Sequence, residues 1–271
     1  MNAINKVQRK FVSLTLVALA SAASLMFAQS ALAQISTTKH NLGTTGPGPN
    51  KFGGTDELCV FCHTPHGADT SAAAPLWNRV ISGTTYQTYD SLGTSTLDGK
   101  TAPVGSVSIA CMSCHDGTQA MNVVINAPGS GGYNATGAPM PGAWSGANQT
   151  GGAISPGLIT NLTTDLRNDH PIGIRYCGGG QTSATPTGAC VDADFRAPST
   201  TAAGGLAGSR QKTDMALYTR GPGAGGGGYV GQTEPEPFVE CASCHDPHSA
   251  NPTFLRIANT GSAVCLACHV K

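Results

Sequence analysis

The stretch Cys241-Ala-Ser-Cys244-His245 has a pattern that occurs four times in this chain. The other copies are Cys59-Val-Phe-Cys62-His63, Cys111-Met-Ser-Cys114-His115 and Cys265-Leu-Ala-Cys268-His269. In each copy the two thiols can add across the two vinyl groups of one haem, and the histidine that follows can ligate the iron as its proximal ligand. The spacing therefore predicts four covalently attached haem c groups.

Two other uses of paired cysteines have to be weighed against this interpretation. Two C-x-x-C pairs can hold Zn²⁺ in a tetrahedral site. In an exported chain the same cysteines can form a disulfide scaffold. Neither alternative explains why a histidine directly follows the second cysteine in all four copies.

The N-terminus has the pattern of a secretory signal. Lys6, Arg9 and Lys10 precede an apolar stretch over residues 11–27, and Ala31-Leu32-Ala33 forms a small-residue cleavage site. We expect Sec-type export with cleavage after residue 33, to the cell surface or extracellular space, with the periplasm as the alternative. An uncleaved membrane anchor is the other interpretation of this segment. No later apolar run is long enough to span a membrane.

Composition limits the fold and the partners. The 271 residues carry 15 Lys+Arg and 15 Asp+Glu, and this neutral balance excludes a strongly basic nucleic-acid binder. Only 6% of residues are aromatic, whereas Gly counts 36 and Pro 17. We therefore expect mostly irregular coil, with short helices at the haem motifs and a few short strands, organised around a haem stack that serves as the core.

The motifs divide the mature chain into three regions. Residues 34–115 form an N-terminal arm and a first two-haem module, and residues 241–271 form a second one. Residues 116–240 contain most of the 36 Gly and no haem motif. The first and third motifs share an added Pro-His, which suggests two copies of one module, although the repeat is weak elsewhere.

The histidine count predicts how each iron is completed. Of the eight His, four belong to the motifs and four are spare: His40, His66, His170 and His248. Four spare His for four haems favour bis-histidine ligation throughout, with these residues as distal ligands. Methionine is the competing axial ligand, and three lie outside the motifs and the signal: Met121, Met140 and Met215.

Two of the distal candidates have an informative position. His66 and His248 each follow a proximal histidine by three residues, across Pro65 or Pro247. Three residues span at most about 10 Å, too short to reach comfortably around a porphyrin. We therefore expect each to ligate the iron of a neighbouring haem, which would bring two haems into close contact.

The haem-free middle region supplies two further predictions. Cys177 and Cys190 are the cysteines left outside the motifs, and in an exported chain they should form a disulfide. His170 follows Asp169, which is either a hydrogen-bond partner for the second ring nitrogen or simply a turn residue.

The stretch from Cys241 to His248, continued by Phe254-Leu255-Arg256 and the fourth motif, resembles the doubled C-x-x-C-H cytochromes. Four other stretches strengthen the resemblance: Lys39-His40-Asn41-Leu42, Cys59 to His66, Pro75-Leu76-Trp77-Asn78-Arg79 and Asp169-His170-Pro171-Ile172-Gly173. Together, from about residue 38 onward, they resemble the tetrahaem c-type cytochromes of metal-reducing bacteria. That family includes an outer-surface member that polymerises into extracellular filaments.

The resemblance implies a continuous stack of bis-His haems that conducts electrons. It also implies partners: copies of this chain in a homopolymer, and other redox cytochromes or extracellular acceptors. In the filament family one axial histidine comes from the adjacent subunit, and His40 is the natural candidate, with ligation within its own chain as the alternative.

Three classes of function follow from these features. An electron-transfer protein, as a filament subunit or a discrete carrier, needs only closed iron sites. A multihaem reductase needs an open iron position, whereas no C-x-x-C-K motif occurs and the spare histidines suffice to close every site. A surface protein with incidental haem is the third class. We expect electron transfer without enzymatic activity.

Overall fold

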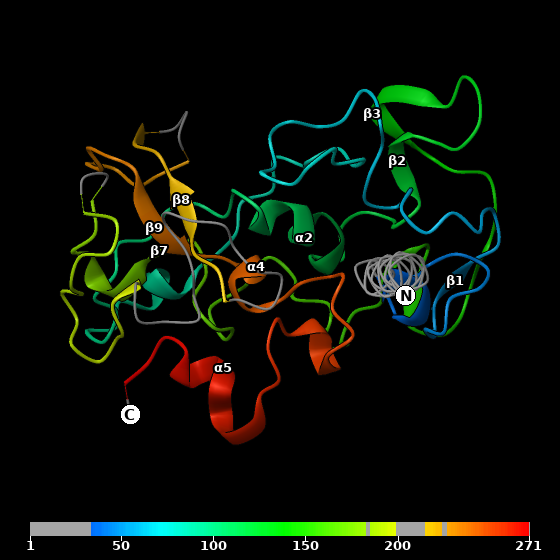
Figure 1. Cartoon of the computed structure of the whole chain (residues 1–271). Helices are drawn as coiled ribbons and strands as arrows, with labels where there is room; N and C mark the ends of the chain where they lie inside the picture. Colours follow the sequence, from blue (N-terminus) through cyan, green and yellow to red (C-terminus); the bar gives the residue numbers. More distant parts are fainter. Residues whose placement is uncertain (1–33, 183–184, 199–214, 224–226, 271) are drawn as a thin grey trace, which may run out of the picture. The chain divides into compact units, whose positions relative to one another are not determined.

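A computed structural model describes residues 34–182, 185–198, 215–223 and 227–270 (Figure 1). The chain divides into two units, Met1–Gln34 and Ile35–Lys271, and the second contains all four motifs. The predicted signal, residues 1–33, lies outside the described residues. No helix in the described ranges is long and apolar enough to cross a membrane.

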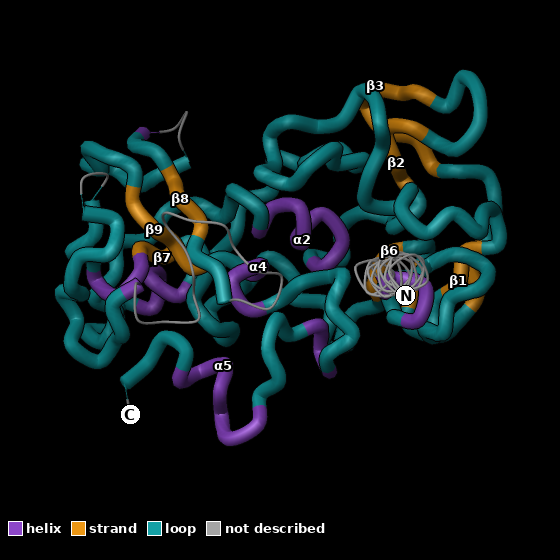
Figure 2. The backbone as a smooth tube through the Cα atoms, viewed as in Figure 1, coloured by secondary structure: helices purple, strands orange, loops and turns teal. Residues whose placement is uncertain are grey.

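Loops and turns make up most of the described backbone (Figure 2). The α-helices are α2 (Ser108–His115), α4 (Cys241–Cys244) and α5 (Ala263–Leu266). The 3-10 helices are η2 (Gln34–Thr37), η3 (Tyr89–Leu92), η4 (Tyr176–Gly178), η6 (Pro252–Phe254) and η7 (Thr260–Ser262). Such short helices are not stable in isolation and depend on tertiary packing.

Among the described residues, nine short strands form four small antiparallel sheets. Three are pairs: β1 (Lys51–Phe52) with β4 (Trp144–Ser145), β2 (Val123–Asn126) with β3 (Tyr133–Pro139), and β5 (Gln149–Thr150) with β6 (Ala153–Ile154). In the fourth, β9 (Glu236–Val239) lies between β7 (Ile174–Arg175) and β8 (Tyr218–Arg220). This sheet positions the third motif, since α4 follows β9 after one residue.

Short helices were expected at the haem motifs, and three of the four have one. The second and third motifs lie in α2 and α4, and α5 covers the start of the fourth. The first motif is instead a hydrogen-bonded turn, in which the Cys59 carbonyl accepts bonds from the amides of Cys62 (3.1 Å) and His63 (2.7 Å). A single turn is sufficient to bring the two thiols and the histidine to one side.

The apolar interior of the described residues consists of three separate small clusters. Their buried members are Phe52, Phe61, Val124 and Met140 in the first; Ala72, Ile109, Ala110, Met112 and Leu166 in the second; and Tyr176, Cys177, Met215, Leu217 and Ala267 in the third. Each cluster includes a residue that lies between the two cysteines of a motif: Phe61, Met112 or Ala267. The protein packs its side chains around the attachment segments.

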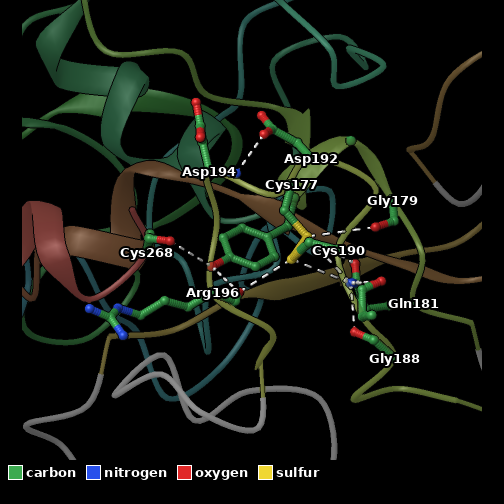
Figure 3. The surroundings of a disulfide bond; sticks show 12 residues. Cys177, Gly179, Gln181, Gly188, Cys190, Asp192, Asp194, Arg196 and Cys268 are labelled. Carbon is green, nitrogen blue, oxygen red and sulfur yellow. Dashed lines mark hydrogen bonds between the residues drawn. A yellow bond between two sulfur atoms is a disulfide. The ribbon is translucent and has the colours of Figure 1, made fainter. Parts of the chain in front are cut away.

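The disulfide predicted between Cys177 and Cys190 is present, with the two Cα atoms 5.4 Å apart. Within its loop, Gly180 has a φ of 99°, and a Cβ there would lie 2.0 Å from the Ala189 carbonyl oxygen. Only glycine allows these two backbones to approach so closely. Figure 3 shows the disulfide beside Cys268 of the fourth motif.

Candidate haem sites

Backbone carbonyl groups orient three of the four motif histidines. In each, the ring Nδ1 lies at hydrogen-bond distance from a carbonyl oxygen: His63 from Pro75 (2.7 Å), His115 from Thr160 (2.8 Å) and His245 from Thr253 (2.8 Å). Because a carbonyl only accepts, Nδ1 must carry the proton and donate it. The Nε2 atom is then unprotonated and available to bind iron, the usual arrangement of a metal-ligating histidine.

The fourth motif is held by the segment that follows the disulfide. The amide of Arg196 donates to the Cys268 carbonyl (2.8 Å), and the amide of Val270 donates to the Asp194 carbonyl (2.7 Å). The ring of Phe195 lies against that of His269, with the centroids 4.3 Å apart. Residues 194–196 therefore fix the histidine of the last motif, a role that the sequence analysis did not predict.

The first and third motifs are supported in the same way. After His63, the Thr64 amide donates to the Leu76 carbonyl (2.9 Å), and the Asn78 amide donates back to the Cys62 carbonyl (2.9 Å). The third motif repeats these bonds, from Asp246 to Phe254 (2.8 Å) and from Arg256 to Cys244 (2.8 Å). Leu76 and Phe254 also share a positive φ, 53° and 59°. The two motifs are therefore equivalent in local structure as well as in their Pro-His extension.

Two distal candidates lie opposite motif histidines. The ring centroids of His63 and His248 are 6.1 Å apart with an interplanar angle of 14°, and those of His115 and His40 are 6.2 Å apart at 88°. Two metal–nitrogen bonds of about 2 Å, with roughly 1 Å from each nitrogen to its ring centre, separate two imidazoles across one metal by about 6 Å. The centroid separations of both pairs are close to this value.

His40 is buried in its own chain, against the ring of Phe254 at 4.2 Å. Burial, together with the nearby His115, lowers the pKa of His40 to about 4, so the imidazole is neutral at pH 7. Its Nδ1 atom is buried and has no partner at full hydrogen-bond geometry among the described residues, although the Pro247 backbone acts on the ring and raises its pKa.

His66 and His170 are exposed, and within the described ranges neither ring pairs with a motif histidine as the other two do. The Nδ1 of His170 lies 3.1 Å from the Pro171 carbonyl oxygen. A hydrogen bond from His170 to Asp169 was one of the two roles considered for Asp169, and the described contacts do not include it.

The eight motif cysteines are free thiols, and none forms a disulfide. Burial, together with Cys114 of the second motif, raises the pKa of the Cys62 thiol to about 12. A side-chain hydrogen bond joins Cys111 to Cys241 of the third motif. Cys244 and Cys268 pack on the same apolar cluster. Successive motifs thus lie next to one another, in the order first, second, third, fourth.

A buried polar network joins the second and third motifs. Ser108, the first residue of α2, donates to the Glu240 carboxylate (2.5 Å), and its hydroxyl oxygen accepts the amide of Cys241 (2.9 Å). The other side of the carboxylate pairs with Arg220 at 2.6 Å. Helices α2 and α4 therefore lie side by side (Figure 1). In the part of the chain that the structure describes, no three His, Cys, Asp or Glu side chains converge as a conventional metal site.

Comparison with known proteins agrees with this geometry for the C-terminal part of the chain. Residues 236–271 match the family model of the doubled CXXCH motif. The match begins at β9 and includes the third and fourth motifs, so this segment has the feature of a multihaem c-type cytochrome. It indicates covalently bound haem c and a role in electron transfer. No curated protein matches the chain.

Proposed function

We propose that this protein transfers electrons through a continuous chain of four bis-histidine haem c groups. The placement of His248 opposite His63, and of His40 opposite His115, carries the proposal. In both pairs the two imidazoles are separated as two axial ligands of one iron would be. Ligation on both faces leaves no open iron position for a substrate. Electron transfer needs no such position, whereas reduction of a bound substrate does.

The protein residues have distinct tasks in this proposal. When bound, each haem supplies an iron that accepts and releases one electron. The motif cysteines hold the haem by thioether bonds, and the carbonyls of Pro75, Thr160 and Thr253 keep Nε2 of three motif histidines unprotonated. The packing of successive motifs against one another favours short distances between neighbouring haems.

The first and third motifs have the same local structure and the same Pro-His extension. We use this equivalence to propose distal ligands for the two remaining haems. His248, from the third motif's extension, lies opposite His63 of the first motif. The equivalent of His248 is His66, so by the same arrangement we assign His66 to the haem of His245. His170 then remains for the haem of His269. Each Pro-His extension would thereby ligate the haem of the other module.

Electron paramagnetic resonance of the oxidised holoprotein tests the proposal. We expect four haems by mass and only low-spin ferric signals, because every iron has two imidazole ligands. A high-spin component in the unmodified protein would instead indicate an open site and favour a reductase. Fewer than four haems would contradict the proposed chain.

The substitution His248→Ala tests the ligand assignment. We expect one of the four haems to become high-spin, since the haem of His63 would lose its distal ligand. Thr94→Ala, at an exposed loop position, is the control and should leave the spectrum unchanged. A fully low-spin spectrum for His248→Ala would overturn the assignment.

We further propose that the chain is exported and assembles with copies of itself into an extracellular filament. The signal-like N-terminus and the resemblance to filament-forming tetrahaem cytochromes support this. The position of His40 favours ligation within its own chain, so subunits would be joined by contacts other than this ligand. Negative-stain imaging of purified holoprotein should show filaments, whereas monodisperse particles would favour a discrete carrier.

A further inference from the structure

Arg79 is fully buried, and all of its guanidinium nitrogens are bonded. The acceptors are the hydroxyl and carbonyl of Ser113, the side-chain oxygen of Gln119, and the carbonyls of Ala120, Met121 and Val123. Every one of these acceptors is neutral. The five N–H groups of arginine are thereby used, so none is left to seek an anion such as a haem propionate.

The charge of Arg79 is therefore not compensated by a carboxylate. Three other arginines, by contrast, each contact a carboxylate: Arg167 pairs with Asp165, Arg175 with Glu236 and Arg220 with Glu240. Arg220 is equally buried but is paired with Glu240 at 2.6 Å, which makes that site neutral overall. Arg79 is a buried positive charge in a low-dielectric interior, where its field is weakly screened.

This charge lies between the first two haem attachment segments. Ser113, to which Arg79 donates twice, lies between the two cysteines of the second motif. The adjoining Asn78 donates its amide to the carbonyl of Cys62 in the first motif. Arg79 is thus hydrogen-bonded to the second motif, and the adjoining Asn78 is hydrogen-bonded to the first.

We propose that Arg79 raises the reduction potentials of the two haems attached at Cys59–His63 and Cys111–His115. Reduction adds one electron to a ferric haem and lowers its charge by one, so a fixed positive charge favours the ferrous product. The inference rests on the proposed electron-transfer function.

The substitution Gln119→Glu tests the charge while keeping the hydrogen bond to Arg79, which is 2.7 Å long. The new carboxylate should neutralise the guanidinium. In a spectroelectrochemical titration of the holoprotein, we expect two of four components to shift to lower potential. For charges about 10 Å apart at an effective dielectric of about 20, the ferrous-to-ferric ratio at fixed potential should fall on the order of tenfold.

Two further variants separate charge from structure. Arg79→Lys keeps the charge but loses most of the bonds, so its potentials should stay close to those of the unmodified protein. Arg79→Met removes the charge and should shift the same two components as Gln119→Glu. Thr94→Glu adds a negative charge at an exposed position and should have little effect because solvent screens it.

The outcomes distinguish this inference from the function on which it rests. Four haems with unchanged potentials in Gln119→Glu would overturn the role of Arg79 and leave electron transfer intact. Equal shifts in Arg79→Lys and Arg79→Met would show that the bonds matter rather than the charge. An unmodified protein that lacks haem at the first two motifs would instead contradict the proposed function.

Discussion

At the scale of single residues, backbone carbonyls orient the rings of three motif histidines, His63, His115 and His245. Pro75, Thr160 and Thr253 follow their histidines by 12, 45 and 8 residues. A carbonyl needs no particular side chain, so the sequence has no signal for this contact. The stretch Pro75–Arg79 was noted for its resemblance to tetrahaem cytochromes, whereas its role in supporting His63 emerges only from the hydrogen bonds.

The disulfide lies next to Arg196, which holds the last motif. The disulfide sulfur of Cys190 lies 3.3 Å from the Arg196 carbonyl oxygen, and the buried Tyr176 hydroxyl donates to the same oxygen (2.8 Å). Arg196 also donates from Nε to the Leu266 carbonyl (2.8 Å). Figure 3 shows this arrangement of Cys177, Cys190, Arg196 and Cys268.

We expect the double substitution Cys177→Ser with Cys190→Ser to lower the free energy of unfolding by about 3 kcal/mol, because the unfolded chain regains the freedom of a closed loop. Denaturant unfolding of the holoprotein measures this. Reductant should destabilise the unmodified protein by a similar amount and leave the double variant unaffected. Equal stability of both proteins would contradict the prediction.

At the scale of elements, one buried network sets how two short helices meet. Helix α2 begins at Ser108 and α4 follows Glu240, and these two residues are joined directly. Glu240 also closes a capping box with Ser243, whose hydroxyl accepts the Glu240 amide (2.8 Å). Burial raises the pKa of Glu240, whereas the partner Arg220 opposes this shift. The Glu240 carboxylate thus joins the start of α2, the start of α4 and the Arg220 guanidinium.

The substitution Ser108→Ala should destabilise the holoprotein by about 1–3 kcal/mol, because it leaves one side of a buried carboxylate and the Cys241 amide without a partner. Thermal unfolding followed by haem absorbance measures the change. Ser82→Ala is the matched control, since the Ser82 hydroxyl contacts Thr84 at the surface. Equal melting temperatures for the two variants would show that the network adds no stability.

At the scale of the whole molecule, three small apolar clusters stand in place of one large core. Each lies at one of the C-x-x-C-H motifs, and the aromatic side chains among their buried members are Phe52, Phe61 and Tyr176. Four porphyrins would add the apolar surface that the aromatic-poor sequence lacks. Haem attachment and folding should therefore be coupled.

We expect a variant with all eight motif cysteines changed to Ser to be largely unfolded, because burial of the haem faces would no longer offset the loss of chain entropy. Circular dichroism during heating should show no cooperative transition, and limited proteolysis should cleave the chain throughout. A cooperative transition close to that of the holoprotein would show that the polypeptide folds on its own.

Local patterns predicted much of this protein. The four C-x-x-C-H motifs and the Cys177–Cys190 pair follow from residue types and spacing. The turn at the first motif was not anticipated, since one hydrogen-bonded turn and a short helix present the same residues. Residues 194–196, which hold His269, carry no recognisable pattern.

The sequence by itself determined which residues are candidates to hold haem, because the two cysteines and the histidine of each motif lie within five consecutive residues. Only the tertiary structure decided that two of the spare histidines lie near motif histidines. His248 meets His63 across more than half of the chain, and His40 meets His115 through the packing of an N-terminal arm against Phe254. Such contacts depend on how distant segments pack, and sequence spacing carries no record of that geometry.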